Sequence, residues 1–262
     1  MTKSDLSREN ASGRFHKLGF VKKDLTNQVG RQKKLLSSNV VAALKYLSNL
    51  RKKDPMMFVQ HTLGKDKRLE RLFWCDGESW LNYEVFGDVL AFDATYRNNK
   101  YNFPFVVFSR INHHNQTIVF GSGLVMNETE DTYVWLLDQF LTAMKGKAPV
   151  SVITDGDLVM KNAIKKVFMN VHHRLCSWHL LRNASANIGI PEFMPYLKRC
   201  MLGDIEVDKF EELWSEMVHK FSLEQNNWIK ELYDRRQMWS TAHIRVFFLC
   251  RHKVNIKVRG TA

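Results

Sequence analysis

The chain has 262 residues, of which 45% are apolar and 12% aromatic. That is enough to bury a sizeable core, and it excludes a wholly disordered or collagen-like chain. No stretch approaches the roughly 20 uninterrupted apolar residues of a membrane span. The start, MTKSDLSREN, lacks the apolar segment of a signal peptide. We expect a soluble protein with no membrane partner, and the widely spaced Cys75, Cys176, Cys200 and Cys250 indicate a reducing compartment.

The net charge of +12 is unevenly distributed. Residues 1–75 hold 17 Lys and Arg against 6 Asp and Glu, residues 76–240 hold 17 against 21, and residues 241–262 hold 5 against none. The basic character therefore belongs to an N-terminal arm and a short tail, while the middle of the chain is mildly acidic. A basic arm favours the binding of polyanions such as nucleic acid. The alternative interpretation of the charge is a solvated surface with a linker.

The N-terminal part is expected to contain one helix and one hairpin. Residues 1–38 are polar without sustained periodicity and are expected to form a flexible basic lead-in. A short amphipathic helix starts after Asn39 and ends before Pro55, because the residue before a proline is pushed out of the helical region. Apolar runs at 58–62 and 69–74 flank a polar turn and predict a β-hairpin.

Two basic clusters in this part are candidate contacts to DNA phosphates. The first consists of Arg31, Lys33 and Lys34 in the lead-in, and the second of Arg51, Lys52 and Lys53 at the end of the helix. Such clusters bind DNA weakly and without sequence preference, and they are compatible with nuclear import.

The centre of the chain is expected to alternate strands and helices. Runs at 88–96, 103–111 and 117–126 with short turns between them predict an antiparallel meander. A helix over 133–144, a strand at 150–154, a further helix, a strand at 172–176 and a helix from Ser177 follow. This β-β-β-α-β-α-β order is that of an α/β ribonuclease-H-like domain with a mixed sheet.

The remainder, 191–240, is expected to be helical. One helix buries a single apolar face, and a second starts near Trp228. The face consists of Phe210, Leu213, Trp214, Met217 and Phe221. Trp178, Trp214, Trp228 and Trp239 resemble base-stacking platforms, but their helical spacing beside leucine and phenylalanine favours a place in the core.

Two aspartates stand where propensity disfavours them. Asp93 lies in the middle of a predicted strand, and Asp155 directly follows the apolar run 150–154. Carboxylates on neighbouring central strands can share divalent ions that promote phosphoryl transfer, usually with a third carboxylate. Both residues also have a purely structural interpretation. Asp93 would then be a polar residue at a strand edge with its hydrogen bonds satisfied, and Asp155 would belong to a turn or a helix cap.

Three segments carry a family resemblance: Asp88 to Tyr96, Ile153 to Asp157, and His173 to Leu180. They resemble the Mutator-like (MULE) transposase domain, and more closely the plant transcription regulators of the far-red-impaired-response family, which descend from such transposases. The likeness covers about residues 20 to 248. It implies that Asp93 and Asp155 correspond to the first two acids of a DDE triad.

The resemblance also shows where this chain departs from the family. The third acid, a glutamate, is expected a few residues after a segment such as His243 to Phe248, yet no acid follows Asp234. Glu224 and Glu231 are expected at exposed positions of the helical insertion and are poor substitutes. We therefore expect a weak, vestigial Mg²⁺ site at Asp93 and Asp155, no required cofactor, and no catalysis.

The family's zinc-binding DNA-recognition module is expected to precede residue 1, and no cysteines and histidines at finger spacing occur before Cys75. We expect a truncated gene model, with an aberrant basic tail over 249–262. Zinc is thus a cofactor of the family but not expected here.

Cys176 and His179 form a Cys-x-x-His motif. The spacing suits two zinc ligands, but no second pair is evident. A core cysteine with a hydrogen-bonded histidine is one interpretation, and a metal or DNA contact is the other.

Together these features predict five segments: a lead-in (1–38), a helix and hairpin (39–86), a MULE core (87–190), a helical insertion (191–248) and a tail (249–262). The leading interpretation is a nuclear, catalytically inactive regulator of transcription that contacts DNA weakly. A DNA transposase or nuclease with an incomplete triad is the alternative. A third hypothesis is a fragment that pairs with a second copy or with full-length relatives.

Overall fold

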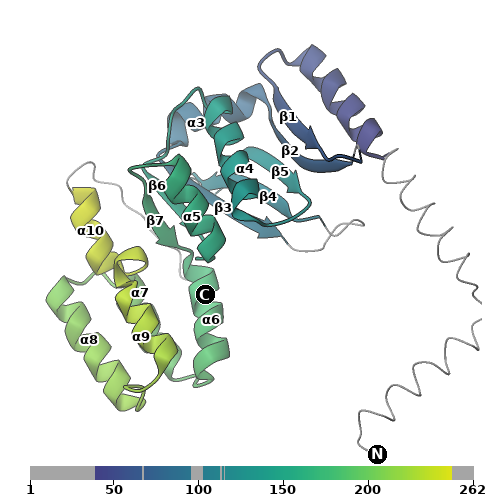
Figure 1. Cartoon of the computed structure of the whole chain (residues 1–262). Helices are drawn as coiled ribbons and strands as arrows, with labels where there is room; N and C mark the ends of the chain where they lie inside the picture. The colour runs from purple at the N-terminus through teal and green to yellow at the C-terminus, as the bar shows by residue number, and fades with distance from the viewer. Residues whose placement is uncertain (1–38, 67, 96–102, 113, 115, 250–262) are drawn as a thin grey trace, which may run out of the picture.

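A computed structural model of the protein describes residues 39–66, 68–95, 103–112, 114 and 116–249 (Figure 1). Residues 39–53 form the predicted N-terminal helix, which ends before Asp54 and Pro55. Arg31, Lys33 and Lys34 lie outside the described residues, as does the tail from Cys250 onward. No described helix combines the length and the apolar character needed to cross a bilayer.

The described strands form a single seven-stranded sheet. They are β1 (Phe58–Leu63), β2 (Leu69–Cys75), β3 (Val89–Thr95), β4 (Phe105–Ile111), β5 (Thr117–Val125), β6 (Ser151–Thr154) and β7 (His172–Leu175). Their spatial order is β1-β2-β5-β4-β3-β6-β7. The β3–β6 and β6–β7 pairs are parallel and the others antiparallel.

This arrangement confirms the predicted hairpin, meander and β-β-β-α-β-α-β order. It also adds a contact that the sequence did not indicate, because β2 pairs with β5 and joins the hairpin to the main sheet.

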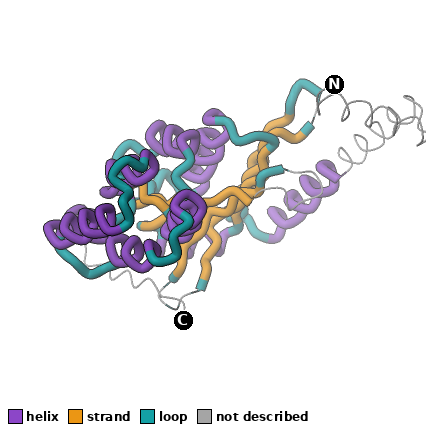
Figure 2. Tube along the Cα trace, turned by 90° about the horizontal axis from the view of Figure 1, so that it is seen from below, coloured by secondary structure: helices purple, strands orange, loops and turns teal. Residues whose placement is uncertain are grey.

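Helices cover both faces of the sheet. Because side chains alternate along a strand, a single strand contributes residues to the cores on both faces. In β2, Phe73 belongs to the main core under α3 (Gly77–Phe86), α4 (Glu130–Ala143) and α5 (Leu158–Val167). Its neighbour Leu72 points the other way and packs with Leu47 of helix 39–53. Figure 2 shows the strands as a layer between helices.

Helix α3 was not expected from the sequence, because its apolar residues do not follow a helical period. Its N-terminus is capped by Asp76, whose carboxylate accepts a hydrogen bond from the Ser79 N–H at 2.7 Å. Tyr83 fills the core from this helix, with its ring 5.2 Å from that of Phe140.

The helices after β7 build a second core. They are α6 (Ser177–Ile188), α7 (Phe193–Leu202), α8 (Val207–Lys220), α9 (Asn227–Asp234), the short 3-10 helix η1 (Arg236–Met238) and α10 (Thr241–Leu249). Phe210 stacks on Trp214 at 6.0 Å, and the Trp239 ring lies 5.7 Å from each. Both tryptophans are buried, as predicted, and Trp228 is half-buried.

The main core depends on a cluster of phenylalanines around Phe108. This ring is fully buried and lies 4.9 Å from Phe140, 5.5 Å from Phe92 and 5.7 Å from Phe73. We predict that Phe108→Ala lowers the free energy of unfolding by about 3–5 kcal/mol in chemical denaturation, because it leaves a cavity that packed neighbours cannot fill.

The control is Val41→Ala, at an exposed position of helix 39–53, which should change the free energy of unfolding by no more than about 0.5 kcal/mol. An equally small effect of Phe108→Ala would contradict the described core.

Candidate functional site

The candidate site lies where β3, β6 and β7 point their carboxyl ends to the same edge of the sheet. The parallel register aligns Ala91 of β3 with Ile153 of β6, and each residue stands two positions before one of the two predicted acids. The sheet therefore brings Asp93 and Asp155 to neighbouring positions. In the same way Thr154 pairs with Leu175, which places Cys176 next to Asp155.

The turn after β6 is tightly specified. Gly156 has φ +92°, a conformation that favours glycine, and an added Cβ would lie 2.6 Å from Leu175 Cδ2. Asp155 Oδ1 accepts a hydrogen bond from the Asp157 N–H at 3.0 Å. Asp157 in turn caps α5 by accepting from Val159 N–H at 2.8 Å and from Met160 N–H at 3.0 Å. The cap of α5 is thus Asp157, whereas Asp155 directly follows β6 and accepts a hydrogen bond within the turn.

His179 completes the group of side chains. It lies in the first turn of α6, and its Nε2 is 3.6 Å from Asp93 Oδ2. The Asp93 side chain is 51% exposed and that of His179 only 19%. Within the described part of the chain, the buried Nδ1 of His179 has no hydrogen-bond partner. The histidine of the Cys-x-x-His motif therefore faces an acid of the site.

The electrostatics of Asp93 reflect this arrangement. Partial burial raises the pKa of Asp93 above its ordinary value, His179 opposes the rise, and Asp155 adds to it. Asp155 and His179 therefore act on the Asp93 carboxylate in opposite directions.

His173, on β7, stabilises the turn beside Asp155. Its Nε2 is hydrogen-bonded to Thr154 Oγ1 at 2.7 Å, and the same hydroxyl accepts from the Gly156 N–H at 3.2 Å. Burial, aided by the nearby Lys161 and Lys165, lowers the pKa of His173 to about 4. This neutral histidine holds the hydroxyl that fixes the turn beside Asp155.

The donor set fits a weak divalent site. Asp93 and Asp155 offer carboxylate oxygens, and Mg²⁺ is commonly bound through one or two carboxylates while water and substrate phosphates complete its octahedron. Among the described residues, no group of three His, Cys, Asp or Glu side chains is arranged to hold a metal ion. The Mg²⁺ and Cys176–His179 metal sites therefore remain predictions.

One sequence prediction is wrong. Trp178 is 61% exposed, whereas its helical spacing favoured a place in the core. The reason is its position on α6, where Leu180 and Ala184 form the buried face and Trp178 lies outside it.

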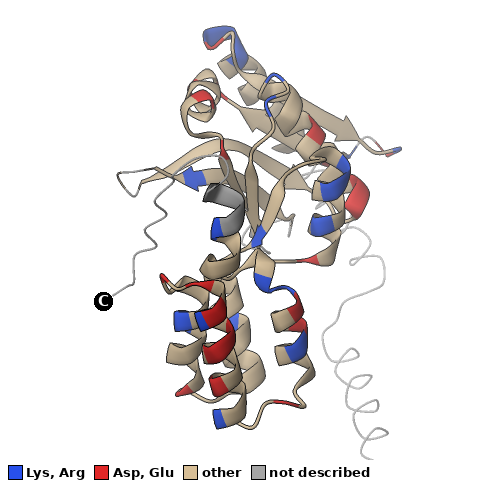
Figure 3. Cartoon of the chain, turned by 90° about the vertical axis from the view of Figure 1, so that its left-hand side faces the viewer, with Lys and Arg blue, Asp and Glu red and all other residues tan. Residues whose placement is uncertain are grey.

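The described basic cluster is distant from the acids along the sheet. Arg51, Lys52 and Lys53 are exposed at the end of helix 39–53, which packs on β1 and β2, whereas β6 and β7 form the opposite end of the strand order. Figure 3, in which charged residues are coloured along the ribbon, shows such residues at both ends of the molecule.

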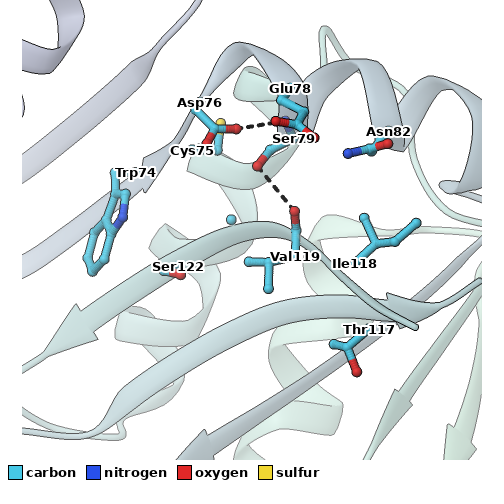
Figure 4. A pocket seen from close by; sticks show the side chains of 11 residues that line it. Trp74, Cys75, Asp76, Glu78, Ser79, Asn82, Thr117, Ile118, Val119 and Ser122 are labelled. Carbon is cyan, nitrogen blue, oxygen red and sulfur yellow. Dashed lines mark hydrogen bonds between the residues drawn. The ribbon is translucent and has the colours of Figure 1, made fainter. Parts of the chain in front are cut away.

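A separate cavity of about 350 Å³ lies between α3, β2 and β5 (Figure 4). Asp76, Glu78 and Asn82 make its lining polar, and the Ser79 hydroxyl donates to the Val119 carbonyl at 3.1 Å. Burial raises the pKa of Cys75 in its wall to about 12, which disfavours the reactive thiolate form. The cavity is not shared with the acids.

The sequence of this chain is similar to known proteins. Residues 89–183, which contain both acids and the Cys-x-x-His motif, match the MULE transposase domain. The chain is 32% identical over 242 residues to Protein FAR1-RELATED SEQUENCE 5 of Arabidopsis thaliana, covering 90% of this chain and 31% of that protein. It is 31% identical over 259 residues to Protein FAR-RED IMPAIRED RESPONSE 1, covering 94% of this chain and 30% of that protein.

The chain carries a MULE transposase domain and is similar to FAR1-related proteins over about nine tenths of its own length. These matches confirm the resemblance drawn from its motifs. The chain spans about a third of the length of the relatives it matches.

Two features of the site were not predicted. The motif spacing alone places His179 one helical turn beyond Cys176, but only the sheet order shows that it meets Asp93. The role of His173 had no sequence signal, because a histidine in a short strand gives no indication of its partner across the sheet.

We predict that His173 makes stability depend on pH. A protonated imidazole carries N–H groups on both ring nitrogens, and its buried Nδ1 has no hydrogen-bond partner among the described residues. The unfolded chain takes up this proton near the ordinary value of 6.5, and the folded chain only near 4. The contribution, at most about 3 kcal/mol, is complete above pH 6.5 and is lost as the pH falls toward 4.

The measurement is urea denaturation at pH values from 7 to 4.5 for the wild type and His173→Gln. The glutamine side chain keeps a hydrogen-bonding group near Thr154 but does not titrate. The wild type should lose more stability than the variant over this range, and parallel curves would contradict the assignment.

Proposed function

We propose that this chain provides a transposase-derived, non-cleaving DNA-contacting module of a nuclear regulator of transcription. The observation that carries the proposal is the pair Asp93 and Asp155, aligned at the ends of adjacent parallel strands within a MULE domain. The order β5-β4-β3-β6-β7, three antiparallel strands followed by two parallel ones, supports a ribonuclease-H-like core.

Loss of cleavage is supported by the donor set. A third carboxylate is usual in two-metal phosphoryl transfer, and among the described residues no group of three His, Cys, Asp or Glu side chains is arranged to hold a metal ion. Glu224 and Glu231 are both exposed in the helical part, and Glu224 Oε1 lies 3.3 Å from His219 Nδ1. Within the described residues, neither forms a hydrogen bond or ion pair with Asp93, Asp155 or His179.

His179 provides a second argument against efficient cleavage. Its Nε2 lies 3.6 Å from Asp93 Oδ2, so one of the two carboxylates already has a partner other than a metal ion. If bound, Mg²⁺ would be held by Asp93 and Asp155 and would polarise a phosphate oxygen. The chain itself contributes positioning of DNA rather than a complete set of ligands.

DNA contact and nuclear location are supported by charge. The exposed Arg51, Lys52 and Lys53 end a helix in which no acidic residue occurs between 39 and 53, and Arg31, Lys33 and Lys34 precede it in sequence. Counterion release gives such clusters weak, salt-dependent affinity for DNA. The far-red response in the name of one relative, FAR-RED IMPAIRED RESPONSE 1, suggests light-dependent regulation as the setting.

A second candidate function is a DNA transposase or nuclease. The retained register of Asp93 and Asp155 favours it, because an inactive domain is not required to keep two acids side by side. The two functions differ in one measurable property, the cleavage of DNA in the presence of a divalent ion.

We predict that the purified chain binds labelled duplex DNA at low salt and does not nick it with either Mg²⁺ or Mn²⁺. The affinity should fall steeply as salt rises, because phosphate contacts release counterions. Gel electrophoresis of supercoiled plasmid after incubation measures nicking, and fluorescence anisotropy measures binding.

The matched variants are Asp93→Ala and, as a control, Asp138→Ala, an exposed acid of α4. Metal-dependent nicking that is lost in Asp93→Ala but kept in Asp138→Ala would establish the nuclease and overturn the proposal. Absence of any DNA binding at low salt would also overturn it.

A further inference from the structure

We propose that Trp178 and Arg182 form a binding subsite for an unpaired nucleotide of single-stranded DNA, next to Asp93 and Asp155. The inference rests on the proposed DNA-contacting function and deepens it, because it assigns the part of the DNA that reaches the acids. Trp178 would stack on the base, and Arg182 would contact a phosphate.

The first observation is the exposure of Trp178. All seven tryptophans lie within the described residues, and the others are buried or half-buried, whereas Trp178 is 61% exposed. A solvent-facing indole forgoes a large amount of apolar burial. An exposed aromatic face is the group on which proteins stack unpaired bases.

The second observation is that the ring is held in place. The His179 ring meets it edge-on, with centroids 4.7 Å apart and an interplanar angle of 78°. The Arg182 guanidinium lies 5.5 Å from the indole centroid, at the i, i+4 spacing that places side chains on one helical face. A ring fixed by two neighbours loses little conformational freedom when a base binds.

The third observation concerns charge. In the part of the chain that the structure describes, Arg182 makes no ion pair with a carboxylate, so its charge is available to a phosphate. The first turn of α6 contains no acidic residue, and its N-cap, Cys176, makes no side-chain capping hydrogen bond. The positive end of the helix therefore adds to the attraction for an anion.

The polar surroundings favour a nucleic acid over a protein as the occupant. Beyond Trp178, the exposed residues of α6 are Arg182, Asn183, Ser185, Ala186 and Asn187. A protein interface centred on a tryptophan would be expected to have apolar neighbours around it. A lone indole next to an arginine fits one base and one phosphate.

The subsite lies close to the two acids. Trp178 contacts His179, and His179 contacts Asp93, so a base stacked on the indole holds its own sugar-phosphate near the acid pair. A duplex keeps its bases stacked on each other and offers no free face to Trp178. The subsite therefore selects frayed or single-stranded DNA.

The test uses the full chain and a fluorescein-labelled oligo(dT) of about 15 nucleotides, a length within the range of known single-strand sites. Anisotropy gives the Kd for the wild type, Trp178→Ala, Trp178→Phe and Arg182→Ala. Val85→Ala is the control, because Val85 is an exposed apolar residue of α3. Thermal melting checks that each variant is folded, which the exposure of the substituted residues leads us to expect.

Trp178→Ala should raise the Kd for oligo(dT) at least fivefold, and Trp178→Phe should recover most of the affinity, because phenylalanine still stacks. Arg182→Ala should raise the Kd and reduce the slope of log K against log salt by about 0.7, the value for one phosphate on a single strand. Val85→Ala should match the wild type, and no Trp178 variant should change duplex affinity more than twofold.

The outcomes separate this inference from the proposed function. If the wild type binds duplex DNA but Trp178→Ala leaves oligo(dT) binding unchanged, the subsite is overturned and the DNA-contacting function stands. If the wild type binds neither duplex nor single strand, both fail. If Trp178→Ala alters only self-association in light scattering, the indole belongs to a protein interface, and the inference is overturned.

Discussion

The parallel pairing of β3, β6 and β7 is the constraint on which the site depends. Asp93 and Asp155 are 62 residues apart in sequence, and only the register that aligns Ala91 with Ile153 makes them neighbours. Because side chains alternate along a strand, a shift of one residue would turn Asp93 to the other face of the sheet and separate the acids. The same pairing sets the start of α6, and therefore the place of His179.

Two separate cores keep this register in place. The phenylalanine cluster beneath α4 and α5 fixes β3, β4 and β5, while the helical core around Trp214 and Trp239 lies beyond β7. Helix α6 begins at the site and contributes Leu180 and Ala184 to the second core. The site thus lies between two well-packed bodies, as expected for side chains that must be held rigidly on scaffold elements.

Local patterns predicted most of the fold and the two acids, whereas contacts between distant segments were not predictable. Turn residues and apolar runs located the strands, and an aspartate inside a strand marked Asp93. Helix α3 was missed because its signals are a cap at Asp76 and one core ring, Tyr83, rather than a periodic face. The exposure of Trp178 was missed because helical spacing cannot tell which of two adjacent residues faces the core.

The most direct measurement of the central claim is disulfide trapping of the two acid positions. In a Cys176→Ser background, the pair Asp93→Cys and Asp155→Cys is oxidised gently and linked peptides are identified by mass spectrometry. The aligned parallel strands predict an efficient link between positions 93 and 155, since neighbouring strands lie about 5 Å apart. A pair of Asp93→Cys with Met169→Cys, beyond the far end of α5, should stay reduced. Free thiols at 93 and 155, or equal linking in both pairs, would contradict the account.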